Sequence, residues 1–276
     1  MDATPDDIEF LVTSDHRVAV LGTLATGPSD RDELRSATGA SSPTISRILA
    51  DFEERNWIER ESRMAQLTGL GEFVADRLSE FVDAMTIEQQ LREVWHWLPH
   101  EFDGFSAELF SDVDVTYPGP GYPDKPTERR LELITDTSTW RGVGVAMLGL
   151  RTLEASFDRF LDQQDKFQCE YIYSPEVFEE LLSWGDTETI MAAADSDSYT
   201  VLLHDDLPID DRFEICIFDD RVTICCYDHE KGGLQALVET SSADARRWAE
   251  SYYDRFRTES QPLEDGYERG SLPSLK

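Results

Sequence analysis

The sequence predicts an α+β / α/β protein in two parts, a small helical unit that ends in a β-hairpin and a larger mixed α/β domain. Three observations predict this division. Residues 15–55 carry apolar side chains at helical spacing, residues 57–67 read as two short strands, and strand and helix patterns alternate from about residue 111 onward. With 276 residues and 40% hydrophobic content, the chain is long and apolar enough to bury a core in each part.

Three short helices are expected at the start of the chain. A helical segment at residues 7–11 precedes a helix that Ser14 or Asp15 caps and that ends near residue 25. Ser29 and Asp30 then precede a helix over residues 31–37, with Glu33 placed for a capping interaction. One small core is expected to join these helices to the elements that follow, and its members are Val18, Leu21, Leu24, Leu34, Ile45, Leu49 and Ile58.

The next helix, expected at residues 42–55, follows a tight turn at residues 38–40 that contains Gly39. With the helix at 31–37 before it, this is the second helix of a helix-turn-helix pair. Ser42 is the expected N-cap of this helix, and Pro43 fits its first helical position. Apolar residues at helical spacing, Ile45 and Ile48 among them, predict that one side of the helix is buried.

A small hairpin is expected next, with strands at residues 57–60 and 65–67 around a tip formed by Ser62 and Arg63, and Thr68 restarts a helix. Helix, glycine turn, helix and hairpin is the order of a winged helix-turn-helix, which presents its second helix to DNA. A generic helical bundle is the alternative that this order argues against.

A long helical pattern covers residues 71–98, and Thr86 is the position at which it can break and restart. Its apolar stripe is too long for a small winged domain to cover. The helix is therefore interpreted as a linker that packs on the next domain, as a dimer helix, or as both, and a homodimer suits half-site recognition. The expected divisions are a winged domain at 1–85, a linker or dimer helix at 86–110, an effector domain at 111–260 and a flexible tail at 261–276.

The second half alternates strands and helices, which indicates a domain with a mixed sheet. A strand at 113–117 leads into an extended loop rich in Pro and Gly, and residues 131–135 fit either a helix or a strand. The remaining expected elements are strands at 143–148, 167–173, 199–204, 213–218 and 221–227, and helices at 151–164, 175–184, 187–194 and 243–257, the last capped by Ser242.

The strongly negative net charge of the chain argues against DNA binding and indicates a high-salt cytoplasm. The formal net charge is −32, the chain contains only four lysines, and acidic residues occur along its whole length. This pattern is typical of surfaces kept soluble in a high-salt cytoplasm, although an ordinary acidic protein without a nucleic-acid role has the same composition. No apolar run is long enough to span a membrane and no signal pattern begins the chain, so a cytoplasmic location is expected.

The two halves together resemble archaeal winged-helix transcriptional regulators of haloarchaeal type. The N-terminal resemblance, to MarR/ArsR-type domains, rests on the stretch from Ser29 to Arg60 and on the TxxG turn at Thr68-Gly69-Leu70-Gly71. The C-terminal resemblance, to the effector domain named after the methanogen filament-growth regulator, rests on VTYPGPGYPDKPTERRLELI, CEYIYSPEVFEELL and the closing stretch from DDLPIDDRF to YYDRF. The resemblance implies a DNA-binding regulator with a sensing or dimerising C-terminal domain.

The predicted DNA contacts belong to the second helix, the helix before it and the hairpin tip. They are Arg31, Arg35, Ser41, Ser42, Thr44, Ser46, Arg47, Arg60 and Arg63. Arg47 is the candidate for reading a guanine, and its alternative is an ion pair with Asp51 one turn further along. Ser42 has capping as its alternative, and Glu59 and Glu61 in the hairpin would repel DNA.

A small-molecule effector, if one binds, is expected among aromatic residues and arginines at strand ends in the second half. These candidates are Tyr117, Arg129, Arg130, Trp140, Tyr171, Tyr173 and His204. No catalytic constellation, cofactor motif or metal site is expected, since His96 and His100 lack a third ligand. In the hairpin at 213–227, a two-residue turn at Asp219 and Asp220 places Cys216 and Cys225 on one face, where buried cysteines or a redox pair are the two interpretations.

Overall fold

The computed structural model describes residues 5–144, 167–184, 187–208, 213–228 and 233–264. The chain divides into two compact units, Met1–Thr86 and Ile87–Lys276. The expected helix at 151–164 lies outside the described residues, as do residues 145–148 of an expected strand.

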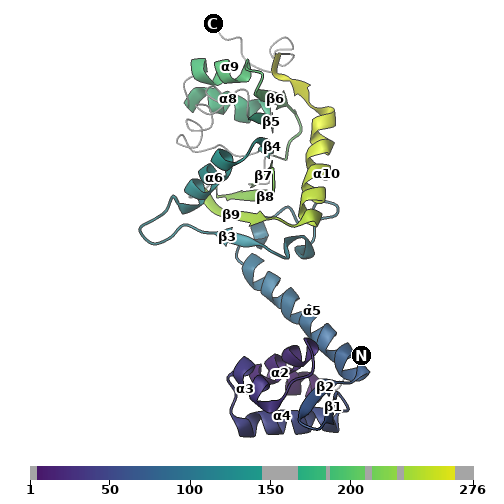
Figure 1. The fold of residues 1–276 in the computed structure, drawn as a ribbon. Helices are drawn as coiled ribbons and strands as arrows, with labels where there is room; N and C mark the ends of the chain where they lie inside the picture. Colours follow the sequence, from purple (N-terminus) through teal and green to yellow (C-terminus); the bar gives the residue numbers. More distant parts are fainter. Residues whose placement is uncertain (1–4, 145–166, 185–186, 209–212, 229–232, 265–276) are drawn as a thin grey trace. The chain divides into compact units, whose positions relative to one another are not determined.

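The first unit consists of short helices followed by a hairpin (Figure 1). Its elements are α1 (Pro5–Val12), α2 (Asp15–Ala25), α3 (Arg31–Thr38), α4 (Ser42–Glu54), β1 (Ile58–Glu61), β2 (Met64–Leu67) and the first part of α5 (Gly69–Leu91). Helix α3 begins with the predicted capping box, because the Asp30 carboxylate accepts the backbone N–H of Glu33 while the Glu33 carboxylate accepts that of Asp30. It ends at Gly39, whose φ of 67° is left-handed.

The core of this unit contains six of the seven predicted residues, together with Ile48, Phe52, Trp57 and Ala65 among others. Val18 is the exception, because it is only half-buried and Val20 takes the place inside the core. Phe52 and Trp57 have ring centroids 5.5 Å apart, and Phe10 of α1 packs edge-on against both. Helix α1 is thereby fixed to the end of α4 and the start of the hairpin.

The hairpin turns at Ser62 and Arg63 as predicted, because Glu61 pairs with Met64 across a two-residue loop. Ser62 has a φ of 59°, a conformation that tight hairpin turns require. Ser29 extends the hairpin on its other side through two backbone hydrogen bonds with Ala65, at 2.9 and 3.0 Å. An isolated β-bridge thus joins the residue before the N-cap of α3 to the β1–β2 hairpin, which is the wing.

The predicted TxxG turn joins the wing to α5. The Thr68 hydroxyl donates to the Asn56 carbonyl at 2.6 Å and accepts the Gly71 N–H at 3.1 Å. A Cβ atom at Gly71 would lie 1.9 Å from the carbonyl oxygen of Trp57, so only glycine fits where α5 crosses the hairpin. Helix α5 then continues through Thr86 without a break and ends at Leu91, earlier than the predicted residue 98.

The second unit is built on an eight-stranded mixed sheet with the order β10-β6-β5-β4-β7-β8-β9-β3. Strands β4, β5 and β6 are parallel, and the other neighbouring pairs are antiparallel. The strands are β3 (Asp114–Thr116), β4 (Thr139–Gly144), β5 (Gln168–Tyr173), β6 (Tyr199–Leu203), β7 (Phe213–Phe218), β8 (Val222–Tyr227), β9 (Leu234–Thr240) and β10 (Gln261–Pro262).

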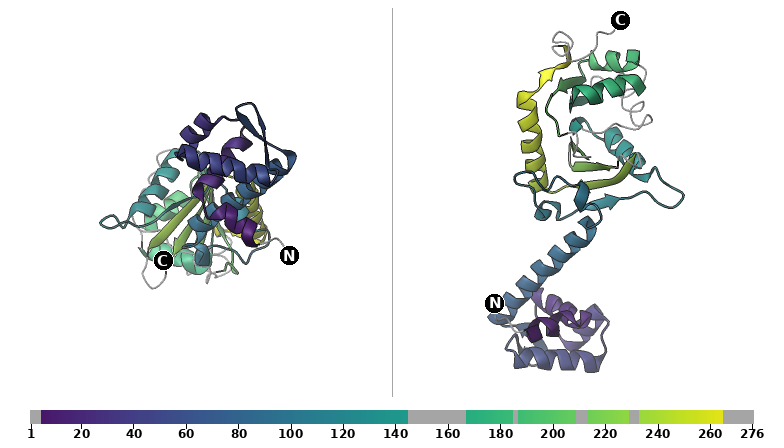
Figure 2. Two further views of the ribbon diagram at one scale, coloured as in Figure 1. Left: turned by 90° about the horizontal axis from the view of Figure 1, so that it is seen from below. Right: turned by 180° about the vertical axis from the view of Figure 1, so that it is seen from behind.

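Helices cover both faces of this sheet (Figures 1 and 2). Helices α6 (Lys125–Asp136), α8 (Pro175–Trp184) and α9 (Thr187–Ala194) pack on one face, which we call the α6 face. Helix α10 (Ala243–Glu259) and the short helix η2 (Ala107–Phe110) pack on the other face, which we call the α10 face. The predicted α/β class with a mixed sheet is therefore confirmed.

The β7–β8 hairpin has the predicted register, in which Cys216 pairs with Thr223 and the Phe218 N–H donates to the Arg221 carbonyl. Both of its faces are buried, because alternate side chains enter the two cores on either side of the sheet. Ser242 caps α10 as predicted by accepting the Ala245 N–H at 3.3 Å.

Several element boundaries differ from the predicted ones. Helix α6 begins at Lys125, inside the expected loop, and Pro126 occupies its first turn, where proline is well tolerated. Strand β4 starts at Thr139, four residues before the predicted position, and β9 was not predicted. Residues 261–264 were expected in a flexible tail, yet β10 pairs with β6 and Leu263 is buried.

Candidate nucleic-acid interface

Helix α4 is held at its N-terminus by two of the predicted contact residues. The Ser41 hydroxyl accepts the Thr44 N–H at 3.3 Å and lies 2.8 Å from the Thr44 hydroxyl. Ser41 is therefore the N-cap, and the prediction of Ser42 is wrong by one residue, because Ser42 already has helical geometry and Pro43 fills the first turn. The hydroxyls of Ser41 and Thr44 stabilise the helix, which leaves those of Ser42 and Ser46 to meet a ligand.

One side of α4 faces the core and the other faces solvent. Ile45, Ile48, Leu49 and Phe52 are buried. The opposite side has a line of residues that we call the α4 strip, formed by Pro43, Ser46, Arg47 and Ala50. Pro43, Arg47 and Ala50 are exposed and Ser46 is half-buried. The strip begins at the N-terminal end of the helix, whose residues winged domains present to DNA.

Arg47 is the free cation of the α4 strip. It has no hydrogen bond or ion pair among the described residues. The alternative pairing with Asp51 does not form, because the Asp51 carboxylate lies 3.9 Å from the guanidinium of Arg17 on α2. An unpaired, exposed arginine keeps all its donors available for a base edge or a phosphate.

The other predicted arginines divide into free and paired groups. Arg31 at the start of α3 and Arg63 at the wing tip are exposed and have no partner in the described part of the chain. Arg35 lies 3.5 Å from Asp32 on its own helix, and Arg60 lies 3.2 Å from Glu53 on α4. Because such exposed pairs contribute little, the paired arginines can exchange partners at low cost.

Acidic groups lie close to these cations. Glu54 at the end of α4 is exposed, and so are Glu59 and Glu61 on β1. The Glu59 carboxylate accepts a hydrogen bond from the side chain of Gln66 at 2.6 Å. The surface around the α4 strip is therefore mixed in charge, and a phosphate backbone would meet repulsion from the wing as well as attraction.

In the second unit, the structure brings four of the seven predicted effector residues together on the α6 face. The Arg130 guanidinium carbon lies 5.8 Å from the ring centroid of Trp140, and Trp140 packs edge-on against Tyr171 at 5.4 Å. Tyr171 stacks on Tyr173 at 4.4 Å. All four side chains are buried.

Glu214, which was not predicted, lies at the centre of this cluster. Its carboxylate accepts hydrogen bonds from Arg130, from the Tyr171 hydroxyl, from the Tyr227 hydroxyl at 2.9 Å and from the Cys216 thiol at 3.2 Å. A buried carboxylate requires such compensation, because an unpaired charge in the core is costly. A lone glutamate in the otherwise apolar strand FEICIF was the sequence signal for it.

Two glycines make room for this arrangement. A Cβ atom at Gly142 would lie 2.2 Å from the Tyr171 ring, and one at Gly144 would lie 2.8 Å from it. The ring of Tyr171, on β5, thus extends across the bare backbone of β4 to reach Glu214 on β7. Gly142 and Gly144 have a packing role here.

The cysteines of the hairpin are buried and reduced. Burial, a hydrogen bond with Cys225 and the charge of Glu214 raise the pKa of the Cys216 thiol well above its ordinary value. Burial likewise raises the pKa of Cys226. Protonated thiols in a packed core are poor nucleophiles, which favours the interpretation of these cysteines as small core residues.

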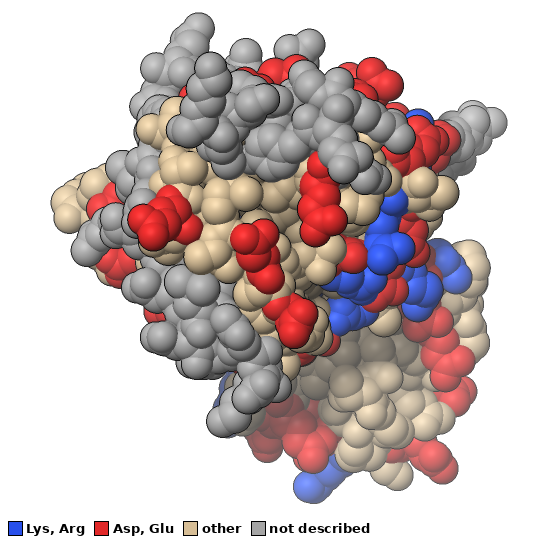
Figure 3. All heavy atoms as spheres, turned by 90° about the horizontal axis from the view of Figure 1, so that it is seen from above, with Lys and Arg blue, Asp and Glu red and all other residues tan. Residues whose placement is uncertain are grey.

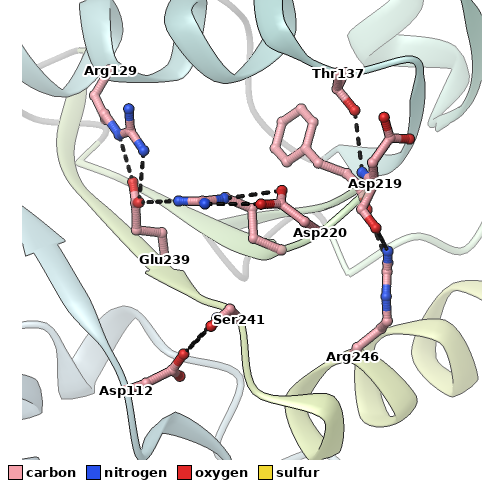
Figure 4. Close-up of polar contacts among 10 residues, drawn as sticks. Asp112, Arg129, Thr137, Asp219, Asp220, Glu239, Ser241 and Arg246 are labelled. Carbon is pink, nitrogen blue, oxygen red and sulfur yellow. Dashed lines mark hydrogen bonds and ion pairs between the residues drawn. The ribbon is translucent and has the colours of Figure 1, made fainter.

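The other three predicted effector residues lie elsewhere. Tyr117 packs against the α10-face core, and His204 packs edge-on against Phe256 of α10 at 5.3 Å. The side chain of Arg129, on α6, points toward Glu239 of β9 (Figure 4). It donates two hydrogen bonds of 2.9 Å to Glu239, which also accepts one from Arg221. The seven residues therefore do not form one site.

Two further findings concern the described residues only. No helix among them is long and apolar enough to cross a membrane. In the same part of the chain, no group of three or more His, Cys, Asp or Glu side chains is arranged to hold a metal ion.

Each of the two units contains a stretch that matches a known family. Residues 5–90 match the family described as the HVO_A0261 N-terminal domain. Residues 123–259 match the middle domain of the methanogenesis regulatory protein FilR1. No curated protein matches the chain.

Solved structures show a distant likeness. TrmBL2, an archaeal chromatin protein, is 12% identical over 94% of this chain and 100% of its own, with a TM-score of 0.42. NucT from Helicobacter pylori is 13% identical over 55% of this chain and 99% of its own, also at 0.42. MepR, a transcription regulator from Staphylococcus aureus, is 22% identical over 35% of this chain and 73% of its own, at 0.28. These scores are low, so the assignment rests on the two family matches and the winged fold. The chain is a winged-helix regulator of the type that joins an HVO_A0261 N-terminal domain to a FilR1 middle domain.

Proposed function

We propose that the protein is a transcriptional regulator that binds operator DNA as a homodimer. In this proposal α4 enters the major groove, the β1–β2 wing lies beside it, and the C-terminal unit senses an effector or mediates assembly. The match to the middle domain of a regulatory protein supports the general role. Winged domains present the N-terminal residues of their second helix to base edges, which supports the specific one.

The observation that carries the proposal is the free guanidinium of Arg47 in the middle of the α4 strip. Within the described residues its nearest acidic neighbour along the helix, Asp51, is paired with Arg17. Arg47 is therefore assigned to a base edge, with Ser42 and Ser46 as short donors beside it. Arg31 and Arg63 are assigned to backbone phosphates on either side.

The acidic surface limits how this protein binds DNA. From Met1 to Glu80 the chain has 8 arginines against 16 acidic residues. In the view of Figure 3, acidic side chains are spread over the surface, while most of the Lys and Arg side chains in view lie in one area. Affinity is therefore expected to depend on a few placed arginines, and the composition suits a high-salt cytoplasm, in which counterion release contributes little.

Helix α5 is the proposed dimer contact. It exposes a series of large apolar side chains, Leu70 at 53%, Phe73 at 61%, Phe81 at 54%, Val82 at 41% and Met85 at 39%. An exposed apolar series of this size needs a partner, and a second copy supplies the same series by symmetry. Sedimentation of the full chain is expected to give a dimer, and the double variant Phe73→Glu, Phe81→Glu a folded monomer. A dimeric double variant would remove α5 from the interface.

For the C-terminal unit we propose a sensing or assembly role centred on the Arg130–Glu214 cluster. A small anionic or aromatic effector is expected to act there by exchanging the internal partners of Arg130. Thermal-shift measurements of the full chain against such compounds test this, with Tyr227→Phe as the matched variant because the Tyr227 hydroxyl accepts a hydrogen bond from Arg130 at 2.8 Å. A compound that stabilises both proteins equally binds elsewhere.

A second candidate function is a winged-helix module that binds protein and not DNA. The exposed acidic groups beside the α4 strip, Glu54, Glu59 and Glu61, favour it. Genome-wide immunoprecipitation under several growth conditions separates the two candidates. Reproducible enriched sites upstream of genes support the regulator, and the absence of enriched sites under every condition supports the protein-binding module.

A further inference from the structure

The α4 strip carries a chemical pattern beyond its single arginine. From the N-terminal end it presents the ring of Pro43, the hydroxyl of Ser46, the guanidinium of Arg47 and the methyl group of Ala50. Pro43, Arg47 and Ala50 are exposed and lie along one line of the helix. One cation is therefore bracketed by two apolar groups on a surface that is otherwise rich in charge.

We propose, resting on the function proposed above, that the α4 strip recognises a guanine with a thymine on each side of it. Arginine donates in bidentate fashion to the O6 and N7 acceptors of guanine, which no other base pair presents together in the major groove. Exposed apolar groups such as an alanine methyl contact the C5 methyl group of thymine. Pro43 and Ala50 thus become specificity-determining residues beside Arg47.

Helix geometry sets the spacing of this element. With a rise of about 1.5 Å per residue, Pro43 lies about 6 Å before Arg47 along the axis, and Ala50 lies about 4.5 Å after it. Successive base pairs are about 3.4 Å apart. Each thymine is therefore expected within about two base pairs of the guanine.

The neighbouring side chains do not compete for these positions. The Ser41 and Thr44 hydroxyls are engaged in capping the helix. Glu53 is paired with Arg60, and Glu54 ends α4 one helical turn beyond Ala50, outside the α4 strip. The free arginines outside α4 meet phosphates, which carry no base identity.

Selection from random duplex DNA with the full chain tests this pattern. The wild-type protein is expected to select a guanine with thymine within two base pairs on both sides. Arg47→Ala is expected to lose the guanine preference by about tenfold or more while the thymine preference persists. Replacing each selected thymine by deoxyuridine removes only its methyl group, and affinity is expected to fall about fourfold for each replacement.

Arg31→Ala is the matched control, because it removes an exposed, unpaired arginine outside α4. It is expected to weaken binding to all sequences equally, and circular dichroism of both variants verifies that the helices form. A selected element without this pattern, or deoxyuridine duplexes that bind as tightly as thymine duplexes, overturns the inference and leaves the proposed function standing. If no duplex is retained at any salt concentration, the proposed function fails and the inference with it.

Discussion

Replacement of Gly71 by alanine is expected to disrupt the N-terminal unit, whereas the same change at Gly69 is not. The added Cβ atom at position 71 would lie 1.9 Å from the carbonyl oxygen of Trp57 and 2.8 Å from its carbonyl carbon. This carbonyl cannot move freely, because it accepts the Thr68 N–H at 2.9 Å. At Gly69, two residues earlier in the same helix, no atom lies within 4 Å of the added Cβ.

The size of the effect follows from these distances. Overpacking a core typically costs about 1–3 kcal/mol, and a clash with backbone is at the upper end because no side chain can rotate away. Displacing Trp57 from Thr68 also removes a hydrogen bond that contributes about 1 kcal/mol. Gly71→Ala is therefore expected to lower the free energy of unfolding of the N-terminal unit by about 3 kcal/mol or more. Gly69→Ala should raise it by roughly 0.5–1 kcal/mol, because alanine favours the helix.

Hydrogen exchange of the full chain, resolved by peptide, measures both effects. Gly71→Ala should lower protection in peptides from residues 1–86 and leave those from β4 to β8 unchanged, because the two units have separate cores. Gly69→Ala should retain or increase protection throughout. Equal protection in Gly71→Ala and the wild type would refute the close packing of α5 on the carbonyl of Trp57.

Two further predictions concern the C-terminal unit. Glu214→Leu is expected to lower the free energy of unfolding, measured by urea denaturation, by about 3–5 kcal/mol, because it leaves Arg130 charged and buried without a partner. The double variant with Arg130→Met should recover much of this loss. A double variant no more stable than the single one would contradict this expectation. Burial raises the pKa of Glu239, but the hydrogen bonds and charges of Arg129 and Arg221 outweigh it and lower the pKa below its usual 4.5. The stability that the ionised Glu239 gives the folded protein is therefore complete above pH 4.5 and is lost as the pH falls through the lower pKa of the folded state. The stability gap between the wild type and Glu239→Gln should shrink below about pH 4.5, and a gap that stays constant from pH 7 to about pH 3 would contradict the assignment.

Local signals in the sequence predicted the N-terminal unit well. Asp30 and Glu33 form the capping box, Gly39 ends α3, and Thr68 and Gly71 form the turn after the wing. Each of these depends on residues close together in the chain, so composition and spacing suffice. The error at Ser42 has the same origin, because two adjacent serines both suit an N-cap and only the backbone conformation distinguishes them.

The C-terminal cluster was only partly predictable, because its contacts join distant segments. Arg130 and Tyr171 were selected as residues of functional type, but their common partner Glu214 was not. Tyr171 reaches Glu214 because Gly142 leaves space over β4 for the tyrosine ring. This contact forms only when β4 lies between β5 and β7 in the sheet. Strand β9 was missed for a similar reason, since six of its seven residues pair with β8, a partner that its local pattern does not indicate.

From the sequence alone, an ion pair of Arg47 with Asp51 was the alternative to a DNA contact. The structure resolves this through Arg17, which comes from α2 and pairs with Asp51 from a distant position in the chain. The sequence named the candidate contact residues, while the distinction between free and paired arginines required tertiary structure.

We propose that a few placed arginines, Arg47 first, carry specific DNA binding on this acidic protein. Fluorescence anisotropy of the full chain on its most strongly enriched genomic site tests this most directly, with Arg92→Ala as the control because Arg92 is exposed and, within the described residues, is paired with Glu88. We predict that Arg47→Ala weakens specific binding by about 1–3 kcal/mol while Arg92→Ala leaves it unchanged. Equal affinity of the wild type and Arg47→Ala for that site would contradict the claim.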